Sequence, residues 1–163
     1  KADIFPIAFA CVAATMAVAK FSNSRIVLRF GARRVSQTAL LAFIGISLAQ
    51  WLAAGMGETM ITFLVLIALN MSMVGFIGAN FSSIAMEPFG HAAGAASSFQ
   101  NAARTLLSAG IGAGIGQMFD GTTVPLAIGF LTCGIIARLV VLWAERGRLF
   151  TRPNPPHRPV PRS

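Results

Sequence analysis

Charge is scarce in this sequence. Charged residues make up 11% of the 163 residues and hydrophobic residues 55%, whereas an ordinary soluble domain carries roughly a quarter charged residues. So little charge does not cover a surface that faces water. The composition therefore excludes an ordinary soluble domain and predicts an integral membrane protein. Sixteen glycines agree with this prediction, because membrane helices carry glycine more often than soluble helices do.

Acidic residues are scarcer still, and none lies deep inside an apolar run. The five are Asp3, Glu58, Glu87, Asp120 and Glu145, all in loops or at the ends of runs. An intramembrane enzyme would need paired catalytic groups, and the chain has no such acid pair, no H-E-x-x-H and no G-x-S-x-G motif. We therefore do not expect an enzyme, and we expect any proton-coupling carboxylate to lie outside this sequence.

Metal ligands and nucleic-acid signals are also lacking. Cys11 and Cys133 have no C-x-x-C spacing and no nearby histidine, so we expect neither a metal site nor a cofactor. The net charge is +8, and most of the cations lie in two blocks, Lys20 to Arg34 and Arg146 to Arg162, which flank apolar runs. That distribution carries topological information and does not predict nucleic-acid binding.

Long apolar runs dominate what remains, and a bilayer core requires about 20 residues per helix. Five runs predict an all-α membrane protein with about five transmembrane helices in residues 1–145, followed by a basic, proline-rich tail over residues 146–163. The predicted spans are Ile4 to Ile26, Val35 to Ala54, Thr59 to Met86, Ala92 to Phe119 and Thr122 to Glu145.

The arginines predict the orientation of these spans, since cytoplasmic loops hold the excess of Lys and Arg. Arginines gather in the loop after the first span and in the tail after the fifth, whereas the loops after the second and fourth spans contain none. The N-terminus is therefore expected outside the cell and the C-terminus in the cytoplasm.

The segment 108–120, "SAGIGAGIGQMFD", has a glycine at every second position from Gly110 to Gly116. It lacks the spacing of a dinucleotide-binding loop and the Lys-Ser or Lys-Thr pair of a phosphate loop. Gly110 and Gly114, like Gly112 and Gly116, instead form G-x-x-x-G patterns that let two membrane helices approach closely. Static packing and a surface that slides during transport are both open.

Two stretches carry a resemblance to a known family. The first, "SRIVLRFGARR" from Ser24 to Arg34, is similar to the loop motif of the major facilitator superfamily, with matches at Arg29, Gly31 and Arg33. Ser24 and Leu28 depart from that motif, as in its weaker second copy. By this resemblance the motif has a conformational role, and a simple cytoplasmic anchor is the alternative.

The second stretch, Met86 to Leu131, resembles the Bcr/CflA drug-resistance branch of that superfamily in its E-P-x-G-H-x-A-G-x-A-S-S segment, its glycine-rich helix and its D-G-T turn. The matching residues are Glu87, Pro88, Gly90, His91, Ala93, Gly94, Ala96, Ser97, Ser98, Gln100, Asp120, Gly121 and Thr122.

The resemblance implies that the five spans correspond to helices 8–12 of a twelve-helix, proton-coupled exporter in the bacterial inner membrane. The expected partners are then a small-molecule substrate, protons, the lipid bilayer and an N-terminal half outside this sequence, with access alternating between the two halves. A metabolite or sugar permease, and a membrane scaffold without transport, are the alternatives.

Polar residues within the spans are the candidates for substrate binding, because polar groups in a bilayer are costly. Arg104 lies near the middle of the fourth span, with Gln100 and Asn101 close by, and Asn70 and Asn80 lie in the third. For Arg104 the alternative is a structural bond or a partner in the absent half. For Asn70 and Asn80 the alternative to substrate binding is hydrogen bonding between helices.

Overall fold

The structure is a computed structural model that describes residues 4–144; residues 1–3 and the predicted tail lie outside the described part. Within residues 4–144 every regular element is helical, which confirms the all-α prediction. The elements are α1 (Ile4–Phe30), α2 (Ala32–Gly55), α3 (Met60–Met86), the short 3-10 helix η1 (Glu87–Ala92), α4 (Ala93–Gln117) and α5 (Val124–Ala144).

Three segments are long and apolar enough to cross a membrane: Ala32–Gly55, Met60–Gly90 and Val124–Ala144. They coincide with the second, third and fifth predicted spans. In the described residues α1 and α4 do not meet this test. The second half of α1 carries three cations, and α4 carries Gln100, Asn101 and Arg104 among many small residues.

The prediction of a loop over residues 24–34 is wrong in length, because helix continues through most of this segment. α1 runs on to Phe30, four residues beyond the predicted end, and α2 begins at Ala32. The turn is Gly31 alone, with φ of 85°, a conformation that residues with a Cβ rarely adopt. Its N–H donates to the Val27 carbonyl at 2.8 Å, so the turn closes directly on the end of α1.

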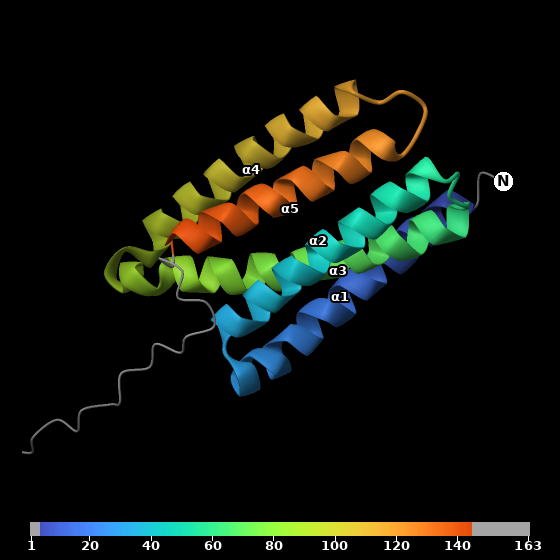
Figure 1. Cartoon of the computed structure of the whole chain (residues 1–163). Helices are drawn as coiled ribbons and strands as arrows, with labels where there is room; N and C mark the ends of the chain where they lie inside the picture. Colours follow the sequence, from blue (N-terminus) through green and yellow to red (C-terminus); the bar gives the residue numbers. More distant parts are fainter. Residues whose placement is uncertain (1–3, 145–163) are drawn as a thin grey trace, which may run out of the picture.

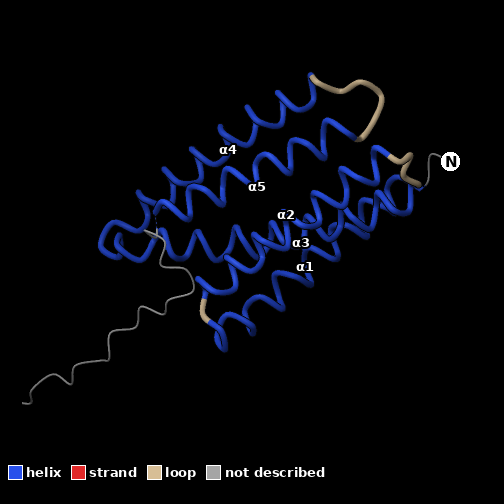
Figure 2. Tube along the Cα trace, in the orientation of Figure 1, coloured by secondary structure: helices blue, strands red, loops and turns tan. Residues whose placement is uncertain are grey.

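α3 is the centre of the bundle. α1 and α2 both pack along it, α5 packs on the other side of α2, and α4 lies outermost, next to α5 (Figure 1). Consecutive long helices run in opposite directions, as the short connections predict. The turn at Gly31 and η1 lie at one end of the bundle, and the turns after α2 and α4 lie at the other (Figure 2).

The contact between α2 and α5 depends on a glycine. A Cβ placed on Gly134 would lie 2.9 Å from Ile44 Cγ1 and 3.1 Å from Phe43 Cδ1, so only glycine allows this approach. The Phe43 ring also packs against Phe130, with ring centroids 5.9 Å apart. Small residues are used in this way where membrane helices pack closely.

Candidate functional site

A reciprocal pair of amides joins α1 to α3. Asn23 Nδ2 donates to Asn80 Oδ1 at 3.0 Å, and Asn80 Nδ2 donates to Asn23 Oδ1 at 2.9 Å. Both side chains are buried, with 6% and 3% of their surface exposed. Each amide thus satisfies the other in the interior, where an unpartnered polar group is costly.

A second polar cluster joins α2 to α3. Ser47 Oγ donates to Asn70 Oδ1 at 3.1 Å, and Asn70 Nδ2 donates to Gln50 Oε1 at 2.9 Å. All three side chains are fully buried. Asn70 and Asn80 therefore bond neighbouring helices, which is one of the two uses expected of them. Their role in substrate binding stays a prediction.

Polar residues form a stripe along α4. Ser97, Asn101, Arg104 and Ser108 are spaced by four, three and four residues, so they follow one face of the helix, and Gln100 lies beside them. We call these five residues the α4 stripe. The opposite face carries Phe99 and Leu106, which are 77% and 74% exposed. α4 is thus amphipathic, yet the described chain buries none of its residues.

Arg104 is the one charged residue of the α4 stripe, the twelfth residue of α4. Its guanidinium reaches toward α3, where Nη2 lies 3.2 Å from the position that a Cβ on Gly78 would occupy. The side chain is exposed, and among residues 4–144 it has no ion pair or side-chain hydrogen bond. A cation near the middle of a helix is thus held close to α3 without a counter-charge in the described residues.

The glycines of α4 meet no other helix in the described part of the chain. A Cβ built on Gly110, Gly112, Gly114 or Gly116 would have no atom within 4 Å. α4 meets α5 instead through Ile115, because a Cβ on Gly129 would lie 2.8 Å from Ile115 Cγ1. Close packing at these four glycines stays a prediction, and it requires a partner beyond residues 4–144.

The loop-motif residues surround the turn between α1 and α2. Gly31 makes the turn itself, Arg29 lies in the last turn of α1 with its guanidinium 5.6 Å from the centre of the Phe30 ring, and Arg33 lies in the first turn of α2. The structure brings the three together at one end of the bundle. Their conformational role stays a prediction.

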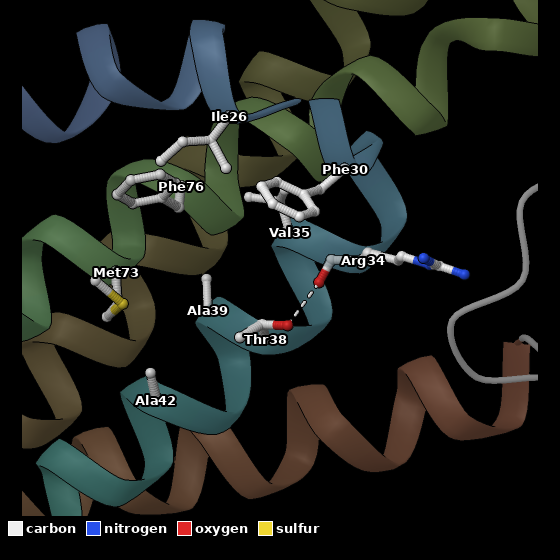
Figure 3. Close-up of a pocket in the computed structure, with 9 residues that line it drawn as sticks. All are labelled: Ile26, Phe30, Arg34, Val35, Thr38, Ala39, Ala42, Met73 and Phe76. Atoms are coloured by element: carbon white, nitrogen blue, oxygen red, sulfur yellow. Dashed lines mark hydrogen bonds between the residues drawn. The ribbon is translucent and has the colours of Figure 1, made fainter. Parts of the chain in front are cut away.

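A groove of about 420 Å³ lies beside this turn, between α1, α2 and α3 (Figure 3). We call it the α1–α2 groove. Its lining residues are Ile26, Phe30, Arg34, Val35, Thr38, Ala39, Ala42, Met73 and Phe76. The guanidinium of Arg34 points away from the apolar side chains, and Thr38 Oγ1 donates to the Arg34 carbonyl at 2.9 Å.

The acidic residues of the described part lie outside the middle of the helices, as expected. Glu58 lies between α2 and α3, where one carboxylate oxygen accepts a hydrogen bond from Thr123 Oγ1. Its other oxygen is buried without a partner in residues 4–144. Asp120 accepts bonds from the Thr122 hydroxyl at 2.6 Å and the Thr122 N–H at 3.0 Å. These bonds lower the pKa of the Asp120 carboxyl. Asp120 thus stabilises its own turn, whereas Glu58 joins the α2–α3 turn to the segment before α5.

Within residues 4–144 no group of three or more His, Cys, Asp or Glu side chains is placed to hold a metal ion. Comparison of the chain with protein-family models, with curated proteins and with solved structures finds no match. The resemblance to the major facilitator superfamily therefore stays an interpretation of the sequence motifs.

The sequence analysis does not single out four residues that the structure places with the candidate residues. Asn23, Ser47 and Gln50 bond the two candidate asparagines, and no pairing signal distinguishes them in the sequence. Ser108 extends the α4 stripe beyond Arg104, and its spacing of four residues from Arg104 was a signal available in the sequence.

Proposed function

We propose that this chain forms helices 8–12 of a proton-coupled small-molecule exporter of the major facilitator superfamily, in the bacterial inner membrane. In this proposal the α4 stripe faces the transport pathway, and Gln100, Asn101 and Arg104 contact the substrate. The observation that carries the proposal is the α4 stripe itself: polar groups line one face of a helix that the described chain leaves uncovered.

The surroundings of the α4 stripe in a membrane support this proposal. A polar face on a membrane helix is costly against lipid, so it is expected to face a water-filled cavity or another part of the protein. The candidate asparagines Asn70 and Asn80 are buried between helices and already bond to neighbouring side chains. Arg104 has no such bond in the described residues, and it is therefore the best candidate for a ligand-facing group.

The five-span arrangement is part of the proposal. At 1.5 Å per residue, α1 with 27 residues and α4 with 25 are each about 40 Å long, which exceeds the roughly 30 Å of a bilayer core. Both carry polar groups that other helices or an aqueous pathway would have to cover. The absent N-terminal half supplies such a cover for α4 in the proposed transporter.

The proposed orientation has the Gly31 turn in the cytoplasm. Arg25, Arg29, Arg33 and Arg34 all lie within six residues of Gly31, and the cytoplasmic ends of membrane helices hold the excess of cations. The opposite end, with the turns after α2 and α4, contains no Lys or Arg in either turn. An outside N-terminus is consistent with this asymmetry.

Efflux measurements on the complete gene test the proposal. The intact protein, Arg104→Ala, Arg104→Lys and the opposite-face control Leu106→Ala would be expressed in a drug-sensitive bacterium. Proton-driven efflux of cationic, neutral and anionic compounds would then be measured at equal membrane abundance. Loss of a hydrogen bond to a charged group costs about 1.5–3 kcal/mol, so we expect Arg104→Ala to lower efflux of at least one compound by about 10- to 100-fold.

The outcomes separate the proposal from its alternatives. Arg104→Lys retains the charge and is expected to keep part of the activity, while Leu106→Ala keeps nearly all of it. Unchanged efflux in Arg104→Ala would remove Arg104 from the pathway. Absence of proton-driven efflux from the intact protein, with uptake of a metabolite or with no transport, would replace the exporter by a permease or by a scaffold.

A further inference from the structure

The α1–α2 groove exists because two consecutive helices diverge. α1 and α2 are joined by Gly31 alone, yet each packs mainly on α3 and they contact each other little. The space between them is therefore open above α3, whose Met73 and Phe76 form the floor (Figure 3). A volume of about 420 Å³ lies within the range of about 300–1,000 Å³ that is usual for small-ligand sites.

The groove is apolar inside and open to its surroundings. Val35 and Ala39 are buried in its wall, with 9% and 6% of their surface exposed. Ile26 and Phe30 on α1 are 37% and 50% exposed, so their side chains form an accessible edge. An apolar hollow that opens along membrane-spanning helices suits a hydrocarbon chain.

Cations surround the mouth of the groove. Arg34 lines it and is exposed, Arg33 is adjacent, and the Arg29 guanidinium lies over the ring of Phe30, a lining residue. No acidic residue occurs anywhere in α1 or α2. Glu87 of η1, an exposed acid, is at the same end of the bundle but is not a lining residue. Among the described residues, cations therefore outnumber acids at the mouth of the groove.

We propose that the α1–α2 groove is a binding site for an anionic phospholipid of the leaflet at the Gly31 end. One acyl chain lies in the groove against Phe76 and Val35, and the headgroup phosphate lies at the mouth near Arg34 and Arg33. Charge complementarity selects this occupant over a zwitterionic lipid, because basic pockets between membrane helices bind anionic headgroups. The site depends on the chain lying in a membrane and not on any transport activity.

Fluorescence quenching tests this site on the full chain in lipid nanodiscs. Trp51→Phe and Trp143→Phe remove the two natural tryptophans, and Phe76→Trp places a reporter in the floor of the groove. A second chain carries Ile136→Trp, whose position on α5 is 55% exposed. The quencher is a lipid with brominated acyl chains, either phosphatidylglycerol or phosphatidylcholine. Each is added at the same low fraction to nanodiscs of unbrominated phosphatidylcholine.

We expect brominated phosphatidylglycerol to quench position 76 several-fold more effectively than brominated phosphatidylcholine, and both to quench position 136 equally. One cation near the membrane surface contributes about fivefold to binding of anionic lipid. Arg34→Gln is therefore expected to reduce the preference by about that factor. Ala42→Phe fills the groove and abolishes the preference, whereas Ala49→Phe, exposed on the same helix face two turns away, retains it.

Three results would overturn the proposal: equal quenching of position 76 by the two lipids, no quenching there while position 136 is quenched, and a preference that survives Ala42→Phe. The first means bulk lipid without recognition, and the second means that protein covers the groove. A Met73→Trp reporter repeats the measurement from the neighbouring turn of α3, so that a folding defect of one reporter does not decide the result.

Discussion

The buried amide pair between α1 and α3 gives the sharpest prediction of stability. Asn23 and Asn80 make two reciprocal hydrogen bonds of 3.0 and 2.9 Å in a site where both side chains are almost fully buried. Side-chain hydrogen bonds between membrane helices contribute about 0.6 kcal/mol each on average, with a maximum near 1.7 kcal/mol. Two bonds therefore predict a coupling free energy of about 1 kcal/mol, and at most about 3 kcal/mol.

A double-mutant cycle measures this coupling. Asn23→Leu, Asn80→Leu and the double variant would be unfolded in mixed micelles with increasing denaturing detergent, and the free energies of unfolding compared with the unaltered chain. Each single variant leaves one buried amide without its partner, at a cost of about 1–3 kcal/mol. The double variant leaves no unpartnered amide. Its loss in free energy of unfolding is therefore expected to be smaller than the sum of the losses in the two single variants.

The control for this cycle is Ser24→Ala. Ser24 neighbours Asn23 on α1, but its hydroxyl is exposed and donates to the Phe21 carbonyl of its own helix at 2.7 Å. Its coupling to Asn80→Leu is expected to be close to zero. Strict additivity of Asn23→Leu and Asn80→Leu would refute the reciprocal bond as a source of stability.

Three further variants test other contacts by the same unfolding measurement. Asn70→Leu removes the shared partner of the α2–α3 cluster and is expected to cost about 1–3 kcal/mol. Gly134→Leu forces a side chain into the α2–α5 contact and is expected to cost about 1–3 kcal/mol or more. In the control Gly45→Ala the added Cβ meets no atom within 4 Å, so this change is expected to be neutral or slightly stabilising. Equal effects of the two variants on the free energy of unfolding would contradict the close α2–α5 contact. Thr122→Val removes a bond that lowers the Asp120 pKa, so that pKa rises in an NMR titration. A lowered carboxyl pKa stabilises the fold at pH values above the ordinary pKa of about 3.9. Thr122→Val is therefore expected to lower the free energy of unfolding fully at neutral pH, and this effect disappears as the pH falls through the lowered pKa. An unchanged Asp120 pKa would contradict the assignment.

Much of the fold was predictable because the apolar runs are long and their ends are marked. The span predicted from Thr59 to Met86 agrees with α3 to within one residue, since Thr59 caps the helix by accepting from the Thr62 N–H at 3.2 Å. The end of α1 was predicted less well. The arginines after Ile26 suggested a loop, but arginine is a good helix former, and only the backbone of Gly31 ends the helix.

The candidate site was predictable in its residue types and less so in its contacts. Arg104, Gln100 and Asn101 stand out in sequence because polar groups are rare in this chain, and the structure places all three along α4. The bond from Asn80 to Asn23 spans 57 positions in the chain, and no local pattern specifies such a pairing. The α1–α2 groove arises from how two helices diverge on a third, which depends on packing that composition does not encode.

Whether the α4 stripe faces water in the membrane is the central question, and thiol labelling of the complete protein answers it most directly. Cys11→Ser and Cys133→Ser remove the two natural thiols, and single cysteines are then placed at Asn101 on the stripe and at Leu106 on the opposite face. A thiol reacts in its ionised form, which requires water. We predict that a membrane-impermeant reagent labels Asn101→Cys and leaves Leu106→Cys unlabelled. Labelling at position 106 alone, or at neither position, would contradict a pathway-facing stripe.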